Sequence, residues 1–527
     1  MKYAGYGRRL VLAEGFTTIG PHWQETIWDN LKPAFDKAIC EGLNLLVWHA
    51  FVCSPDEMGL PGQQYFAGTH FNPLTTWWNK SGPFLQYINR CQFLMQQGTF
   101  VADACYYYGD HVPNFSQRKH SDPAKLLPGY DYDVVTEEIL LTAMKVRDGR
   151  LVLPGGMSYR LLVLPNRDFV SLPVLRKLRE LVARGATILG PKPSQPSSLR
   201  RFPQSDQELS TIADELWGSG PAAGIRHYKK GRVISNKTAR EVLALDGVAP
   251  DFEFSSAAPS RPTPSPSQID YIHRRAGDVE IYFVMNRTNA PEHLNCTFRV
   301  SGKAPELWDP VTGKERFATT YSETEGRTTL PLKFSPCGSW FVVFRAPASK
   351  SPPTGHPNHP TFEPMAALEG PWSVHFDPRW NAPESVQFEQ LVSWTERPEP
   401  DIRHYSGTAT YRKTFDLPAG SGDSLWLDLG DLRELAEVRL NGQSKGILWS
   451  PPFRVKLTGA KPSNNLLEIE VVNFWPNRLI GDASLPAEKR RTRTNIRKLT
   501  PQTALMPSGL FGPVRFLREI PAQSQSR

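Results

Sequence analysis

The chain has 527 residues, of which 39% are hydrophobic and 22% are charged. This composition is typical of a globular protein and argues against disorder, and the length predicts several domains rather than one core. Lysine and arginine outnumber aspartate and glutamate by 61 to 53, but the excess is scattered along the chain. We therefore expect no nucleic-acid partner. No apolar run is long enough to cross a bilayer, so we expect no membrane insertion.

Residues 8–125 alternate between short apolar runs and amphipathic, helix-like stretches. Each apolar run ends in polar or aromatic residues. The three runs are residues 10–13, 43–47 and 100–103, and they lead into Glu14, into Trp48 and His49, and into the segment from Tyr106 to Asp110. Two helices are predicted between them, over residues 28–41 and 77–97, each followed by a glycine. Because the carboxyl ends of parallel strands share one rim, this pattern predicts the catalytic rim of a β/α barrel.

Three strands are too few to close a barrel, and an open parallel sheet would leave an unpaired edge. Residues 1–7 also lack the hydrophobic segment of a signal peptide. We therefore expect residues 1–128 to be the C-terminal part of a (β/α)8 barrel whose first part and export signal lie upstream. An extracellular or periplasmic location would follow for the full-length protein.

The next segment, residues 129–254, reads as a doubly wound α/β domain. It shows no glycine-rich phosphate-binding loop, which favours a structural role. The predicted elements are helices over 134–146, 172–184 and 208–217, strands over 161–164 and 186–190, and a strand-helix pair over 231–246.

Beyond a Ser/Pro/Ala-rich linker, residues 255–267, the hydrophobic pattern changes to a period of two. Residues 266–346 predict a small β-sandwich, residues 347–366 a second linker, and residues 367–520 a further domain of short strands. The pair Asn441-Gly442 predicts a tight hairpin turn because both residues tolerate a positive φ. The predicted fold class is multidomain, α/β followed by β.

Two further sequence features, the cysteines and a basic stretch near the C-terminus, indicate no functional site. The six cysteines have neither CxxC nor zinc-ligand spacing, so we expect free thiols and no disulfide framework. The basic stretch 489–493, with Arg497 and Lys498, is read as a solvated loop.

The C-terminal block contains several recognisable phrases. Taken together, it resembles the galactose-binding-type jelly roll that accompanies family 2 glycosidases. The phrases are residues 372–378, 394–396, 405–411, 438–442, 473–482 and 507–510.

The N-terminal phrases are more specific. Residues 13–17, residues 68–72 followed by Trp77 and Trp78, and residues 106–110 resemble glycoside hydrolase family 106, the α-L-rhamnosidases. The resemblance implies a barrel that extends upstream and a calcium-dependent, inverting enzyme with paired carboxylates. It does not say which atoms would hold calcium.

Inverting hydrolysis needs a proton donor and a second carboxylate that activates water. Glu14, at the end of a predicted buried strand, is the candidate general acid, because burial would favour its protonated form. Asp110 is the candidate base or calcium ligand, and Glu137, or Glu138 beside it, is the alternative base. For each of these acids the alternative interpretation is a purely structural position, as a helix cap, in a loop or on an exposed helix face. The hypothesis requires the side chains of Glu14 and Asp110 to line one shared hollow, a cavity large enough for a sugar ring.

Aromatic, histidine and amide side chains at strand ends are the candidates for substrate contact, although a core position is the ordinary alternative for each. They are Trp48, His49, His70, Asn72, Trp77 and Tyr108. The chain is therefore expected to be an α-L-rhamnosidase-like glycosidase that acts on terminal rhamnosyl linkages of a carbohydrate partner. The alternatives are a non-catalytic carbohydrate-binding protein and a β-galactosidase-like enzyme. The oligomeric state is left open.

Overall fold

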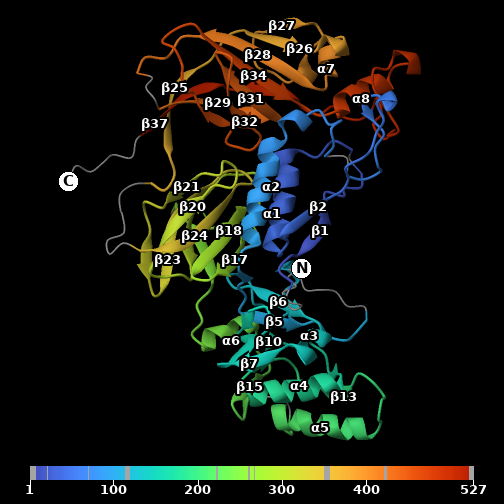
Figure 1. The fold of residues 1–527 in the computed structure, drawn as a ribbon, viewed down its shortest axis with the longest axis vertical. Coiled ribbons are helices and arrows are strands. Elements are labelled where there is room, and N and C mark those ends of the chain that lie inside the picture. Colours follow the sequence, from blue (N-terminus) through green and yellow to red (C-terminus); the bar gives the residue numbers. More distant parts are fainter. Residues whose placement is uncertain are drawn as a thin grey trace, which may run out of the picture.

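A computed structural model gives the fold (Figure 1). It describes residues 8–20, 22–68, 71–112, 119–220, 224–258, 262–265, 268–348, 357–420 and 424–520. Four units follow one another along the chain. In Figure 1 the doubly wound unit lies at the lower end, the C-terminal unit at the upper end, and the first and sandwich units between them.

The first unit contains two parallel strands, β1 (Leu12–Gly15) and β2 (Leu45–Trp48), and two helices, α1 (Lys32–Cys40) and α2 (Gly82–Met95). A π-helical turn, Ile27–Leu31, leads into α1. Strands and helices occur where the sequence predicts them. However, within the part of the chain that the structure describes, β1 pairs with β2 alone, and its side chains are exposed, Leu12 to 62%. The prediction that this strand is buried is wrong for the described chain.

The third apolar run divides differently from the prediction. β4 (Thr99–Phe100) pairs with β17 of the sandwich unit, while β5 (Ala104–Tyr107) joins the doubly wound sheet between β6 and β10. All four residues of β5 are buried, because helices or loops cover both faces of that sheet. A strand buried on both faces has the same sequence pattern in a barrel and in a doubly wound sheet. The doubly wound unit therefore starts before residue 104, not at residue 129.

The doubly wound unit has a six-stranded sheet in the order β14-β15-β12-β10-β5-β6, parallel except for β14. The predicted helix over 134–146 is mostly wrong: Val134 and Val135 continue β6, and Thr136, in an extended conformation, starts a short helix. The remaining elements are β6 (Tyr132–Val135), α3 (Glu137–Thr142), β7 (Lys145–Arg147), β8 (Arg150–Val152), β9 (Ser158–Tyr159), β10 (Leu161–Val163), β11 (Phe169–Val170), α4 (Leu172–Ala183), β12 (Thr187–Leu189), β13 (Gln195–Pro196), α5 (Gln204–Trp217), β14 (Ile225–Tyr228), β15 (Gly231–Ile234) and α6 (Ala239–Leu245).

The sandwich unit packs a four-stranded sheet, β16-β19-β23-β22, against the sheet β21-β20-β24-β18-β17-β4. Its core includes Tyr282, Phe298 and Phe344, which come from both sheets. Its first strand begins at Phe252, inside the predicted preceding domain. The strands are β16 (Phe252–Ser256), β17 (Ile269–Ala276), β18 (Val279–Asn286), β19 (Glu292–Phe298), β20 (Lys303–Trp308), β21 (Glu315–Phe317), β22 (Ser322–Thr324), β23 (Arg327–Phe334) and β24 (Ser339–Pro347).

The C-terminal unit has two antiparallel sheets, β25-β37-β29-β33 and β27-β26-β28-β34-β31-β32, around a core that includes Trp372, Trp394 and Tyr411. The predicted hairpin turn at Asn441-Gly442 joins β31 to β32, and both residues have positive φ. The elements are β25 (Thr361–Ala367), β26 (Trp372–Phe376), β27 (Ser385–Phe388), α7 (Pro400–Arg403), β28 (Thr408–Phe415), β29 (Leu425–Asp428), β30 (Asp431–Arg433), β31 (Leu435–Leu440), β32 (Gln443–Leu448), β33 (Arg454–Lys456), β34 (Asn465–Val472), α8 (Pro476–Ala483), β35 (Arg493–Thr494), β36 (Gly509–Gly512) and β37 (Arg515–Ile520).

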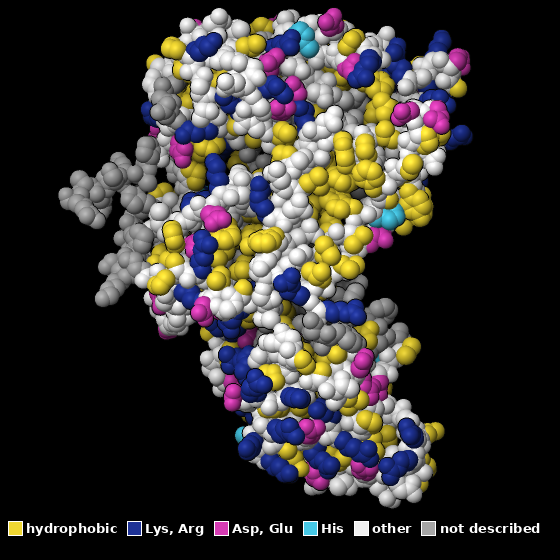
Figure 2. All heavy atoms as spheres, in the orientation of Figure 1, with side chains coloured by type: hydrophobic (Ala, Val, Ile, Leu, Met, Phe, Trp, Pro, Cys, Tyr) yellow, Lys and Arg dark blue, Asp and Glu magenta, His cyan; other side chains and the backbone are white. Residues whose placement is uncertain are grey.

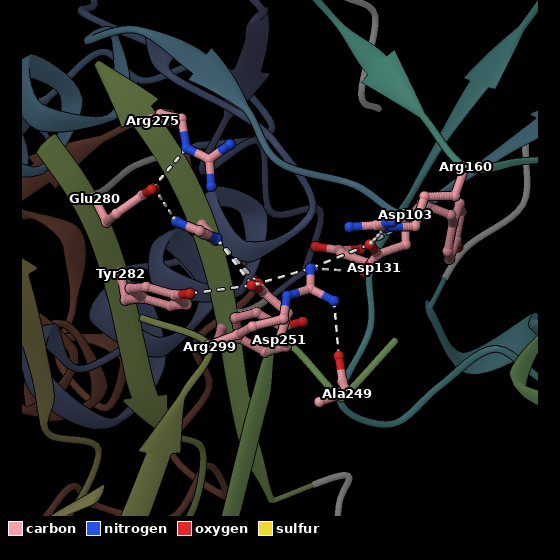
Figure 3. A network of polar contacts seen from close by, with 12 residues as sticks. Asp103, Asp131, Arg160, Ala249, Asp251, Arg275, Glu280, Tyr282 and Arg299 are labelled. Carbon is pink, nitrogen blue, oxygen red and sulfur yellow. Dashed lines mark hydrogen bonds and ion pairs between the residues drawn. The ribbon is translucent and has the colours of Figure 1, made fainter. Parts of the chain in front are cut away.

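A buried polar network joins the doubly wound unit to the sandwich unit (Figure 3). Arg299 pairs with Asp103 at 3.0 Å and with Asp251 at 3.4 Å. His273 connects Asp251 to Glu280. The paired charges hold the two units in one orientation.

All six cysteines are free, and five of them are buried. Within the described residues, no helix combines the length and apolar character needed to span a bilayer.

Candidate active site

Glu14 lies at the carboxyl end of β1, beside the end of β2. Its side chain is exposed, and Thr17 donates a hydrogen bond of 2.5 Å from Oγ1 to its Oε1. In the strand pair, Glu14 is level with Val47, and Gly15 is level with Trp48. A Cβ atom at Gly15 would lie 2.3 Å from Leu46 Cδ1, so only glycine lets Leu46 pack here. The carboxylate is therefore presented at the carboxyl end of the strand pair, on the face that it shares with Val47, while Trp48 shares the other face with Leu46.

Exposed and partly buried rings surround this strand end; we call Phe16, Trp48, Phe51, Phe71 and Trp78 the aromatic surface. Trp48 stacks on Phe71 with ring centroids 4.3 Å apart and packs against Phe16 at 4.9 Å. Trp78 contacts Phe71 and Phe51. Hydrophobic side chains gather at the level of β1 and β2 in Figure 2. An aromatic surface at the end of a parallel strand pair is suited to binding a sugar ring.

His49 follows β2 and faces Tyr65, with ring centroids 5.1 Å apart. Its Nδ1 is buried and has no hydrogen-bond partner. His49 therefore has an unused hydrogen-bonding atom close to the aromatic surface.

Two other predicted contact residues are buried. Asn72 is fully buried; its Nδ2 donates to Gln64 Oε1, and its Oδ1 accepts from the Leu74 amide. Trp77 is 3% exposed and packs against Phe71 and Phe84. Both stabilise the loop under the site, so the prediction that they contact substrate is wrong. His70 lies outside the described residues.

The C-terminal unit holds the long loop that follows β2. β3 (Pro61–Gly62) pairs in parallel with β35, and Gln64 exchanges two hydrogen bonds of 2.8 Å with the Asn495 side chain. Trp475 Nε1 donates to the carbonyl of Leu74 at 2.6 Å. Sequence analysis missed this support, because the partners are about 400 residues apart. The basic stretch read as a solvated loop in fact ends in the paired strand β35.

The two ends of the β1–β2 pair face different units. Val11 and Asn44, which precede the two strands, line a pocket together with Asp133 and Met157 of the doubly wound unit. The carboxyl ends, with Glu14 and Trp48, lead instead into the loop bound by the C-terminal unit. The candidate active site is therefore at the end of the strands that points away from the doubly wound sheet.

Tyr108, Asp110 and Glu137 belong to the doubly wound sheet and not to the Glu14 site. Asp110 lines a small pocket with Tyr107, His111 and Trp217, and the Tyr108 amide donates to Val135. The prediction of one hollow shared by Glu14 and Asp110 is wrong, because β1 and β5 lie in different sheets.

Asp110 and Glu137 both act on Tyr107. Burial raises the pKa of Tyr107 well above its usual value, and the charges of Glu137 and Asp110 raise it further. Glu137, the first residue of α3, accepts a hydrogen bond of 2.8 Å from Ser171. These two acids thus follow β5 and β6 at the carboxyl edge of the doubly wound sheet, apart from the sheet of Glu14.

Across the described residues, no group of three or more histidine, cysteine, aspartate or glutamate side chains is arranged to hold a metal ion.

A carboxylate at the carboxyl end of one parallel strand, with aromatic rings at the end of the next, fits an active-site rim of a β/α enzyme. Residues 4–322 match the family model for α-L-rhamnosidases, glycoside hydrolase family 106. The chain belongs to this family, as its N-terminal phrases predict.

Two relatives illustrate the similarity. The chain superposes on the rhamnosidase from Novosphingobium sp. PP1Y with a TM-score of 0.87 and 33% identity, covering 97% of this chain and 48% of that one. It is 24% identical to a protein of Formosa agariphila with the name "Putative beta-glucuronidase", covering 97% of this chain and 63% of that one. The chain thus spans less than two thirds of the length of each relative.

Proposed function

We propose that this chain takes part in the inverting hydrolysis of terminal α-L-rhamnosyl linkages. Family membership supports the substrate class. The observation that carries the proposal is the exposed Glu14 carboxylate, held by Thr17 at the carboxyl end of β1, where the neighbouring strand β2 ends in Trp48 of the aromatic surface.

Inversion requires an acid that protonates the leaving oxygen and a base that takes a proton from water, about 6.5–9.5 Å apart. The sequence-based assignment of Glu14 as the acid assumed burial. The structure instead exposes Glu14, which accepts a hydrogen bond from the Thr17 hydroxyl. In our proposal Glu14 is therefore the base, and Thr17 orients it toward the attacking water.

The aromatic surface suits a 6-deoxy sugar. Rhamnose carries a methyl group in place of a hydroxymethyl group, so part of its outline is apolar, and the faces of Trp48 and Phe71 can cover it. Binding orients the ring so that the anomeric carbon faces Glu14.

The second carboxylate is assigned neither to Asp110 nor to Glu137, which belong to another sheet. β1 pairs on one edge only, and Leu12 and Val47 are strongly exposed. Further β/α units packed against β1 would cover these side chains and complete a barrel. We further propose that such units carry the general acid. Both relatives are longer than this chain, which agrees with this proposal.

The test uses an iminosugar of L-rhamnose configuration, whose positive charge imitates the transition state and is attracted to a carboxylate. We expect calorimetric binding to the chain, weakened at least tenfold in Glu14→Gln and unchanged in the exposed control Glu369→Gln. Hydrolysis of nitrophenyl α-L-rhamnoside, β-D-glucuronide and β-D-galactoside is measured in parallel. Preference for a glucuronide or galactoside, or equal iminosugar binding by Glu14→Gln, would contradict the proposal.

A further inference from the structure

A cavity of about 380 Å³ is lined by residues of both the sandwich unit and the C-terminal unit. In Figure 1 the boundary of these units is on the left of the view, where β37 lies above β21 and β23. One wall of the cavity belongs to β19 and β23, and the other to β29, β33 and β37. Ligand pockets typically have volumes of ~300–1,000 Å³. These strands carry no residue of the candidate active site, so the cavity is a separate feature of the fold.

The sandwich wall presents two basic side chains. His293 of β19 and Lys333 of β23 are directly opposite each other in their sheet. Their sequence neighbours Leu294 and Leu332 are buried in the sandwich core, so His293 and Lys333 lie on the outer face of the sheet. Within the described part of the chain, Lys333 forms no ion pair.

The C-terminal wall places one acid between two arginines. Asp428 of β29 is opposite Arg454 of β33 on one side and Arg515 of β37 on the other. Opposite residues share a face, and Leu427, on the other face, is buried in the core. Arg454 donates from Nε to Asp428 at 2.7 Å, and its guanidinium lies 5.3 Å from the Phe362 ring. The terminal nitrogens of Arg454 and the Arg515 guanidinium form no hydrogen bond or ion pair with described residues.

The charges that line this cavity do not balance. Three permanent cations, Lys333, Arg454 and Arg515, face a single carboxylate, Asp428. The buried His359, whose Nε2 accepts from the Lys333 amide at 3.0 Å, lies in the same positive surroundings. Burial lowers its pKa to about 3, and the charge of Lys333 contributes to this decrease. A cavity with an excess of one sign of charge attracts ligands of the opposite sign.

We propose that this cavity binds the anionic group of an acidic polysaccharide, either a uronate carboxylate or a sulfate ester. Guanidinium groups donate paired hydrogen bonds to such oxyanions, and Asp428 holds Arg454 in place for this contact. Phe362 and Leu517 supply apolar surface for the sugar ring. That the ligand is a saccharide rests on membership of a glycoside hydrolase family, and not on the proposed rhamnosyl specificity.

The test measures binding to the purified chain by isothermal titration calorimetry. The probes are trigalacturonate, a sulfated carrageenan tetrasaccharide and neutral maltotriose. We expect at least one acidic probe to bind, with an affinity that falls as salt is added, and maltotriose not to bind. Binding of trigalacturonate alone, of the sulfated probe alone or of both supports the proposal and identifies the anionic group. The probes contain no rhamnose, so failure of the proposed hydrolysis would leave this result unchanged.

The double variant Lys333→Gln/Arg515→Gln should weaken binding of the acidic probe at least tenfold. Both positions are exposed, so we expect the fold to be retained, which an unchanged affinity for the rhamnose iminosugar would verify. The control Lys230→Gln/Lys314→Gln removes the same charge from exposed positions outside the cavity and should change the affinity less than twofold.

Three outcomes would overturn the proposal. The first is that neither acidic probe binds, or that maltotriose binds as tightly as they do. The second is an equal loss of affinity in the two double variants, which would reduce the effect to net charge. The third is tighter binding of a single-stranded DNA oligomer through Lys333 and Arg515, which would assign the cavity to a different class of ligand.

Discussion

The imidazole Nδ1 of His273 lies 3.1 Å from Oδ2 of Asp251, and both side chains are almost completely buried. The other ring nitrogen, Nε2, lies 2.8 Å from Glu280. With a carboxylate at each nitrogen, the ring is held as a cation. Burial alone would lower the pKa of His273, but Asp251 and Glu280 outweigh burial and raise it above its usual value.

This arrangement predicts a stability that falls as the pH rises. A histidine whose pKa is higher in the folded state contributes its full stabilisation below its unfolded pKa, about 6.5, and loses it as the pH passes its folded pKa. Asp251 and Glu280 have lowered pKa values, so their contribution is lost instead at acidic pH. Arg299, Arg275 and Tyr282 also face the cluster. We expect the melting temperature to decline from neutral to alkaline pH, as measured by calorimetry.

His273→Gln should lower the free energy of unfolding by about 3 kcal/mol near pH 6, because it removes the cation shared by Asp251 and Glu280 and leaves the buried Asp251 with Arg299, at 3.4 Å, as its counter-charge. The variant should also lose the decline above neutral pH. His227→Gln, at an exposed position of β14, is the matched control. An identical pH profile in His273→Gln and wild type would refute this role.

A second buried pair predicts a similar loss. Lys32 Nζ lies 2.7 Å from Asp36, both are fully buried, and Lys32 also binds the Cys337 carbonyl and Ser339 of the sandwich unit. Lys32→Met should cost about 3–5 kcal/mol in urea unfolding, because Asp36 would remain charged and unpaired.

The double variant Lys32→Met/Asp36→Leu should recover most of this loss, since both charges are then removed. Lys37→Met, an exposed position on α1, should change little. A double variant no more stable than Lys32→Met would show that the lost stability comes from packing and not from the unpaired charge.

Glu14 and Asp110 follow strands of different sheets, so we expect their variants to differ in iminosugar affinity. Asp110→Asn should leave iminosugar affinity within about twofold of wild type, because β5 is not part of the β1–β2 sheet. Glu14→Gln should lose at least tenfold. Isothermal titration calorimetry measures the iminosugar affinity of both variants. A loss in Asp110→Asn equal to that in Glu14→Gln would show that the two acids share one binding site.

The hairpin between β31 and β32 predicts a local effect. Asn441 has a φ of 51°, and its side chain accepts from the Leu466 amide and donates to Asn465. Asn441→Ala should lower stability by about 1–2 kcal/mol through the lost hydrogen bonds and the strained φ. Asn464→Ala, with a φ of 55°, removes a left-handed asparagine whose side chain makes no such bonds to β34. A loss in Asn464→Ala as large as in Asn441→Ala would assign the effect to φ alone.

The sequence by itself was sufficient for features that depend on neighbouring residues. The paired strands and helices of the first unit follow from apolar runs and helix-ending glycines, and the Asn441-Gly442 turn follows from its tolerance of positive φ. The family could also be inferred, because its phrases lie in continuous stretches around Glu14. The position of Glu14 at a strand end needed no knowledge of distant contacts.

Only the tertiary structure decided which side chains meet. An apolar strand such as β5 fits a barrel or a doubly wound sheet equally well, so the placement of Asp110 depended on its hydrogen-bonded neighbours. The contacts of Gln64 with Asn495 and of Trp475 with Leu74 join residues about 400 apart. Local sequence pattern carries no record of such pairs, because they form only when separately folded surfaces pack together.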